Sequence, residues 1–245
     1  MQAKITIAYD GTHFFGSQPL RHRGHNTHPT VLSVIEEALK GIGIDGPVSA
    51  AGRTDRFVHA TGQVIGFELP PFWQDANKLK AELNRKLWPL ISIRRVELAG
   101  DDFHPRFSAK RRAYRYLIAP DRPTVFQTRF LTYAPVFDPC RAQEAIKAFE
   151  GTRDFFYFSK RGSDEKATVR TLFQTRLYSY RGLYIAYFEG DSFLRSQIRM
   201  MMTGVLRAAA GQAEVSDIAA QLEGRQIRFR VPAPAQGLYL AKVGY

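Results

Sequence analysis

A short polar loop carries the residues of this chain that are best suited to chemistry. Residues 51–64 read Ala-Gly-Arg-Thr-Asp-Arg-Phe-Val-His-Ala-Thr-Gly-Gln-Val and lie between two apolar segments. The carboxylate of Asp55 could act as a nucleophile or as a general base, and the sequence leaves both roles open. On composition alone, an Asx-type turn at Thr54 and Asp55, with Arg53 as a surface charge, is an equally good interpretation.

The charge of the chain favours a polyanionic partner. The 245 residues include 35 Lys and Arg against 23 Asp and Glu, which gives a net charge of +12. Basic residues cluster, as in Lys110-Arg111-Arg112. Cations that neutralise phosphates release counterions, and guanidinium groups suit phosphate contacts and base stacking. We therefore expect nucleic acid as the partner, with these three residues as candidate phosphate contacts or, alternatively, part of an exposed strand.

The elements that must position the loop alternate between strands and amphipathic helices. Alternation and apolar spacing predict strands at 4–9, 47–51, 62–69, 91–98, 112–118, 170–180, 183–190 and 237–243. They predict helices after Thr30 and at 75–88, 139–149, 193–210 and 215–222. We expect an α+β fold of two fused, related α/β-sandwich halves, residues 1–104 and 105–245. Their mixed, mainly antiparallel sheets are expected to meet at a basic cleft.

Several classes of protein are disfavoured by what the sequence lacks. It has one cysteine, Cys140, no apolar run of membrane-spanning length and no signal-like N-terminus, so cytoplasm is the default compartment. It has no phosphate-loop or dinucleotide motif and no cysteine pair, so we expect no cofactor and no metal. His22, His25 and His28 lie in one loop, which we interpret as a loop facing the nucleic acid rather than as a metal site.

Six segments follow one another in a recognisable order. They are Tyr9-Asp10-Gly11 with Gly16 and Gln18, the loop from Gly52 to Val64, residues 102–116, Val169-Arg170-Thr171-Leu172, residues 193–201, and Gly237-Leu238-Tyr239-Leu240. Together they resemble the TruA family of tRNA pseudouridine synthases, whose loop signature is G-R-T-D-x-G-V-H-A-x-G-Q-V. The chain departs from the family at Arg56-Phe57, where small residues are usual, and at Ser17, where a large one is common. The usual glycine would permit a positive φ that Phe57 would resist.

The resemblance implies a homodimer that isomerises uridine to pseudouridine in the anticodon stem-loop of tRNA, at tRNA positions 38–40. It implies that Asp55 is the catalytic carboxylate, that Arg199 pairs with Asp55 and keeps it ionised, and that Tyr114 stacks on the target base. Arg53 is our candidate for filling the gap left by the flipped base or clamping the backbone. His59 is a candidate for substrate contact, although a hydrogen bond that braces the loop is the preferred role.

Two other functions remain open at this point. An RNA-binding module, or a catalytically altered relative with a changed substrate, would bind RNA without this reaction. A glycoside hydrolase would use paired carboxylates, whereas only one carboxylate stands in the motif-rich loop. Modification that Asp55→Ala abolishes while binding survives would exclude the module, and release of free uracil would support the hydrolase.

Overall fold

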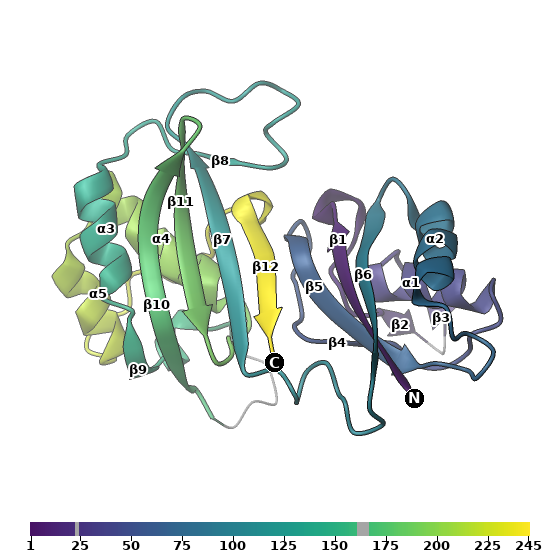
Figure 1. Ribbon diagram of the computed structural model, residues 1–245. Helices are drawn as coiled ribbons and strands as arrows, with labels where there is room; N and C mark the ends of the chain where they lie inside the picture. The colour runs from purple at the N-terminus through teal and green to yellow at the C-terminus, as the bar shows by residue number, and fades with distance from the viewer. Residues whose placement is uncertain (23–24, 161–166) are drawn as a thin grey trace. The chain divides into compact units, whose positions relative to one another are not determined.

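The computed structural model describes residues 1–22, 25–160 and 167–245, which form two compact units (Figure 1). The first contains Met1–Lys110 and Tyr239–Tyr245, and the second contains Arg111–Leu238. Both units combine helices with a mainly antiparallel sheet, which confirms the expected α+β class. Within the described ranges, no helix has both the length and the apolar character needed to cross a membrane.

The sheet of the first unit has the strand order β6–β1–β5–β12. Strand β1 pairs antiparallel with both β5 and β6, whereas β12 runs parallel to β5, and β4 pairs antiparallel with the other end of β5. A separate ribbon joins β2 to β3. The bounds are β1 (Gln2–Tyr9), β2 (Arg21–His22), β3 (His25–Asn26), β4 (Ser49–Ala50), β5 (His59–Glu68), β6 (Ile91–Ala99) and β12 (Leu238–Gly244).

Two helices, α1 (Val31–Lys40) and α2 (Ala76–Leu87), pack on this unit's sheet. The side chains of Ala3, Ile5 and Ile7 are fully buried, while those between them on β1 are only half-buried, so one face of the strand supplies the core. Thr30 forms a capping box at the start of α1, and Asp75 accepts hydrogen bonds from the first turn of α2. These caps place both helices as the sequence predicts.

The sheet of the second unit has the order β7–β11–β10–β9, and a short β8 pairs parallel with β7. A two-residue turn with positive φ at Arg181 (48°) and Gly182 (77°) joins β10 to β11, and such turns match the twist of a hairpin. The predicted hairpin is therefore confirmed. The bounds are β7 (Arg111–Ala119), β8 (Thr132–Tyr133), β9 (Gly151–Asp154), β10 (Val169–Tyr180), β11 (Leu183–Gly190), α3 (Pro139–Lys147), α4 (Gln197–Ala209) and α5 (Val215–Leu222).

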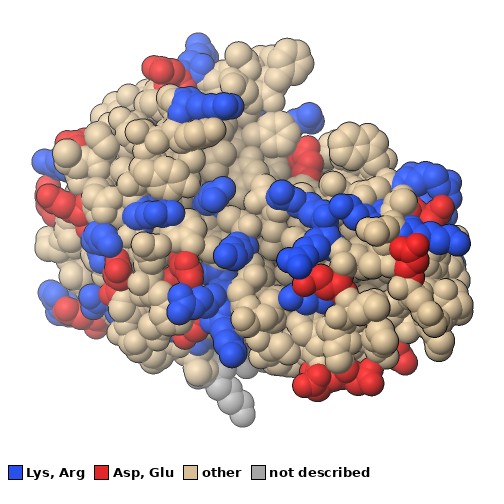
Figure 2. Space-filling view, in the orientation of Figure 1, with Lys and Arg blue, Asp and Glu red and all other residues tan. Residues whose placement is uncertain are grey.

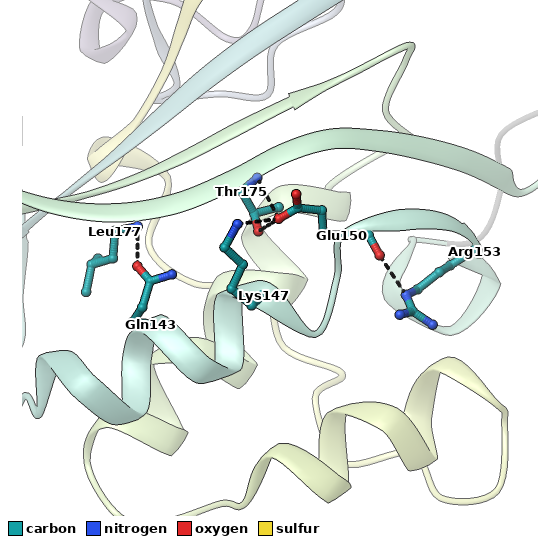
Figure 3. Close-up of polar contacts among 6 residues, drawn as sticks. All are labelled: Gln143, Lys147, Glu150, Arg153, Thr175 and Leu177. Carbon is teal, nitrogen blue, oxygen red and sulfur yellow. Dashed lines mark hydrogen bonds and ion pairs between the residues drawn. The ribbon is translucent and has the colours of Figure 1, made fainter.

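Polar contacts attach α3 and the segment after it to β10 (Figure 3). Glu150 accepts a hydrogen bond from Lys147 at 2.6 Å and another from the hydroxyl of buried Thr175 at 3.1 Å. Farther along β10, the backbone N–H of Leu177 donates to the side chain of Gln143 at 2.9 Å. The hydrogen bond from Lys147 and those from Thr175 lower the pKa of Glu150. Thr175 and Leu177 of β10 thus hold α3 and the residues after it against the strand at two positions.

The structure differs from the prediction at several elements. The helix predicted from Phe193 begins at Gln197, because Ser196 has a φ of 58° and a left-handed residue interrupts a right-handed helix. The strand predicted at 47–51 shortens to the two residues of β4. The four residues of β9 were not predicted, since their charged sequence shows no apolar alternation.

Candidate active site

Asp55 opens a tight turn in the first unit. The backbone N–H of Val58 donates to the carbonyl of Asp55 at 3.1 Å, which closes a β-turn with Arg56 and Phe57 at its corners. Asp55 is half-buried, whereas both corner residues are exposed. The carboxylate therefore stands on a loop with a defined path, which a group that must approach a substrate requires.

The residue before Asp55 is fixed by three buried hydrogen bonds. The backbone N–H of Thr54 donates to the Ser17 hydroxyl at 2.9 Å, and the N–H of Ser17 donates to the carbonyl of Thr54 at 3.1 Å. The hydroxyls of Thr54 and Tyr9 lie 2.8 Å apart. Ser17, at which the chain departs from the family pattern, therefore holds the loop directly. Sequence reasoning missed the positioning roles of Ser17 and Tyr9, although Tyr9 stands in a matched motif.

Two glycines of the opening motif lie against the backbone of the Asp55 loop. A Cβ on Gly11 would be 2.1 Å from the carbonyl oxygen of Val58, and a Cβ on Gly16 would be 3.0 Å from that of Thr54. Gly16 also has a φ of 99°. The opening motif and the Asp55 motif are thus two sides of one packed structure, which accounts for glycine at both positions.

His59 braces the same structure. Its Nδ1 accepts a hydrogen bond from the backbone N–H of Gly11 at 3.0 Å, and its ring stacks on Tyr239 with centroids 4.7 Å apart. Nδ1 also lies 3.4 Å from the carboxylate of Asp10, but a nitrogen that accepts from Gly11 carries no proton to give Asp10. We therefore take the bond from Gly11 as the one that sets the ring. The geometry agrees with the bracing interpretation.

Gln63 on β5 ties down the start of the Asp55 loop at Gly52. The side-chain amide of this buried residue donates to the carbonyl of Gly52 at 2.7 Å, and its oxygen accepts from the N–H of Gly52 at 3.3 Å. The two bonds imitate a strand pairing. The Gly-Gln-Val end of the loop motif thus fixes the loop's beginning.

Alkaline pH is expected to weaken this packing through Tyr9. Burial raises the pKa of Tyr9 to about 12, while hydrogen bonds from Thr54 and Gln63 oppose the shift. The unfolded chain ionises its tyrosines near pH 10, so it releases the proton first, and stability falls as the pH rises from about 10 to about 12. Each such proton contributes about 1.4 kcal/mol per pH unit. Burial also raises the pKa values of Tyr116, Tyr187 and Tyr239, so these residues add to the same loss of stability at alkaline pH.

In the Tyr9→Phe variant, the unfolding free energy should therefore fall less steeply with pH above about pH 10, because one proton fewer is released on unfolding. Urea unfolding at several pH values from neutrality to pH 11.5 measures that slope, about 1.4 kcal/mol per pH unit for one proton. A slope identical to the parent's would show that Tyr9 ionises freely in the folded chain.

Phe57 adopts the backbone conformation that the family's glycine would favour. Its φ is 67°, at the third residue of the turn, where glycine relieves a cost of roughly 1–2 kcal/mol. Phe57 therefore takes this φ against the resistance that the sequence leads us to expect of its side chain. We expect Phe57→Gly to be more stable than Phe57→Ala by about 1 kcal/mol, because Ala keeps the strain. Urea unfolding compares the two, and an Ala variant as stable as the Gly variant would contradict the strain.

Two further predicted site residues, Tyr114 and Arg199, lie in the second unit. Tyr114 lies on β7, with its ring edge-on to Phe193 at 5.2 Å between centroids. Arg199 lies in the first turn of α4, and its Nε donates to the carbonyl of Ala233 at 2.8 Å. The N–H of Ala233 donates in return to the carbonyl of Arg199 at 3.0 Å. This exchange fixes the plane of the guanidinium.

Lys110, Arg111 and Arg112 do not form one surface. Arg111 and Arg112 point to opposite faces of β7. Arg111 is exposed and pairs with Glu189 at 3.2 Å, whereas Arg112 is 7% exposed and donates to the carbonyl of Asp191 at 2.7 Å. Lys110 is the last residue of the first unit's longer segment; it is exposed, and its N–H donates to the carbonyl of Gly244.

Asp191 is also held by the Val-Arg-Thr-Leu motif, because its carboxylate accepts from the N–H of Thr171 at 3.2 Å. Arg112 and Thr171 therefore fix the segment that leads into α4.

Positive charge gathers over β6 and α2 of the first unit, with some acidic side chains among it (Figure 2). A hollow of about 750 Å³ lies between these elements, and Lys80, Arg85, Arg94 and Trp88 are among the residues that line it. Trp88 is 70% exposed. Exposed aromatic and basic side chains together suit RNA. Arg53 is exposed on the Asp55 loop as well.

The described residues contain no group of three His, Cys, Asp or Glu side chains that could hold a metal ion. The side chains of His22 and His25 lie outside the described part of the chain. The ring of His28 stacks on Phe15 with centroids 4.2 Å apart.

Comparison with known proteins identifies the family. The sequence model of the family described as tRNA pseudouridine synthase matches residues 5–108 and 145–245. The chain belongs to the tRNA pseudouridine synthase family. This family isomerises uridine to pseudouridine in tRNA, so the resemblance drawn from the six segments is confirmed.

Curated relatives match over almost the whole chain. The tRNA pseudouridine synthase A of Wolinella succinogenes is 40% identical over 98% of this chain and 92% of its own length. That of Helicobacter hepaticus is 37% identical over 99% of this chain and 98% of its own. The match to a chain of a solved Cbf5-Nop10-Gar1 complex covers 80% of this chain and 43% of that chain, at 13% identity and a TM-score of 0.34.

Proposed function

We propose that this chain isomerises uridine to pseudouridine in tRNA, with Asp55 as the catalytic carboxylate. Membership of the family supports the reaction. The observation that carries the assignment of Asp55 is its place on a turn whose neighbours, Thr54 and Val58, are held by hydrogen bonds to Ser17, Tyr9 and the turn itself. A half-buried carboxylate on so fixed a backbone can be aimed at one atom of a substrate.

The reaction breaks the C1′–N1 bond of the target nucleotide and rejoins the uracil through C5. Asp55 acts on the sugar, either as nucleophile at C1′ or as the base that removes a ribose proton. In this proposal Arg199 keeps Asp55 ionised, and Tyr114 stacks on the flipped uracil. The exchange of hydrogen bonds between Arg199 and Ala233 supports a role that needs an oriented guanidinium.

The RNA is bound through basic and aromatic groups. Arg53 fills the gap left by the flipped base or clamps the backbone, and exposed Lys110 and Arg111 contact phosphates. Arg112 and His59 support these contacts by holding the segment before α4 and the Asp55 loop. The target lies in the anticodon stem-loop, and the protein works as a homodimer in the cytoplasm, as the resemblance implies.

Release of tritium from tRNA transcripts labelled at uracil C5 tests this function, because rejoining at C5 expels that hydrogen. We expect the chain to release tritium from a transcript with uridines in its anticodon arm and none once those uridines are replaced by cytidine. Binding of tRNA without tritium release would contradict the isomerase and favour an RNA-binding module.

A further inference from the structure

The turn that follows Asp55 carries a stack of a cation and three rings. The guanidinium carbon of Arg56 lies 4.1 Å from the ring centroid of Phe15 and 4.5 Å from that of Phe57. Phe15 in turn stacks on His28, with the two ring planes 11° apart. We infer that this stack (His28, Phe15, Arg56 and Phe57) is an RNA-contact surface, where Arg56 binds a phosphate and Phe57 packs on a base beside the target uridine.

This inference rests on the proposed function, and it assigns a role to the two residues at which the loop departs from its family. Both stand at the corners of the turn, and the Phe57 side chain is 37% exposed. Within the described ranges, no acidic side chain pairs with Arg56. A guanidinium that lies over a ring keeps its N–H groups in its own plane, available to phosphate oxygens. In a chain of net charge +12, an exposed Arg56 close to the equally exposed Arg53 suits a polyanion such as RNA.

The backbone at Phe57 indicates that its ring serves more than local packing. A positive φ at a bulky residue costs free energy that glycine would not, and such strain tends to occur where function requires it. Phe15 already covers Arg56, at the shorter of the two distances. A second ring on the outer side adds an exposed aromatic face within two residues of Asp55. When the target nucleotide is flipped, the bases beside it lose a stacking partner, and an aromatic ring can replace it.

Phe57→Gly is the sharpest variant, because it removes the ring and leaves a residue that prefers the same φ. We expect it to lower kcat/KM for tRNA and to weaken tRNA binding in filter assays by about tenfold, the scale of one base–aromatic stack. Phe57→Tyr should retain the parent's values. Phe72, 68% exposed in the same unit, provides the control, and Phe72→Ala should bind tRNA as the parent does.

Arg56 gives an independent readout. Arg56→Ala should reduce the slope of log affinity against log salt by about one phosphate contact, and Arg56→Lys should restore the slope but not the full affinity. A Phe57→Gly variant with the parent's affinity and kcat/KM would overturn the inference. The inference would also be overturned if Phe57→Gly changed the oligomeric state without changing tRNA affinity, since the ring would then contact a second copy of the chain rather than RNA.

The two proposals fail separately. If the parent releases tritium and Phe57→Gly has the parent's kinetics, the RNA-contact role of the stack is rejected and the isomerase activity stands. If the parent releases no tritium but Phe57→Gly binds tRNA more weakly than the parent, the RNA-contact role is supported and the isomerase activity is rejected.

Discussion

Asp55→Asn should lower pseudouridine formation by at least about a thousandfold and leave tRNA affinity within about twofold of the parent's. The amide has the shape of the carboxylate but is neither a competent nucleophile nor a base. The turn should survive, because the hydrogen bond that closes it uses the backbone carbonyl of Asp55 and the N–H of Val58. Single-turnover tritium release measures the chemical step, and filter binding measures affinity.

The contrast between Asn and Glu at this position sharpens the result. Asp55→Glu keeps the carboxylate but moves it by one methylene, so partial activity above that of Asp55→Asn is expected. If Asp55→Asn retained a tenth or more of the parent's rate, another group would perform the chemistry. Loss of tRNA binding in the Asn variant would instead assign Asp55 to recognition.

Gly11→Ala should destabilise the protein by about 3 kcal/mol and reduce its activity by about a hundredfold. The new Cβ would lie 2.1 Å from the carbonyl oxygen and 2.5 Å from the carbonyl carbon of Val58. Both atoms belong to backbone, so no side-chain rotation can relieve the contact. The loop must therefore move away from the opening motif, and Asp55 moves with it. Urea unfolding and tritium release on the same preparation measure the two effects.

Gly41→Ala is the matched control in the same unit. Its Cβ would come within 2.9 Å of the terminal nitrogen of Lys86, the mobile end of a long side chain, and 3.5 Å from the carbonyl of Ala38. This variant should stay within about 0.5 kcal/mol of the parent. Equal stability of the Gly11 and Gly41 variants would show that the loop yields without cost, and the packed structure described around Asp55 would be wrong.

Most elements of the fold could be predicted because local signals mark them. Thr30 and Asp75 cap the two helices of the first unit, and the alternation from residue 4 to 9 marks β1. The late start of α4 could not be predicted, since nothing in the residue type of Ser196 requires a φ of 58°. The pairing of β12 with β5 joins residues about 180 positions apart, and single-sequence periodicity carries no information on such contacts.

The candidate site was predictable only in part, for a similar reason. Motif order draws attention to Asp55, Tyr114 and Arg199, but it does not say what holds them. Ser17 differs from its family pattern, yet it exchanges hydrogen bonds with Thr54. Likewise, Phe57 has a φ that its side chain disfavours, and a linear sequence does not show that Arg56 lies over the rings of both Phe57 and Phe15.

Nucleoside analysis of the modified tRNA tests the central claim most directly. After incubation with the parent, digestion to nucleosides and chromatography should show pseudouridine formed in step with the loss of uridine, and no free uracil. The Asp55→Asn preparation should show uridine unchanged. Free uracil and an abasic tRNA would contradict the account in favour of a glycosidase, and unchanged uridine with the parent would contradict it in favour of RNA binding alone.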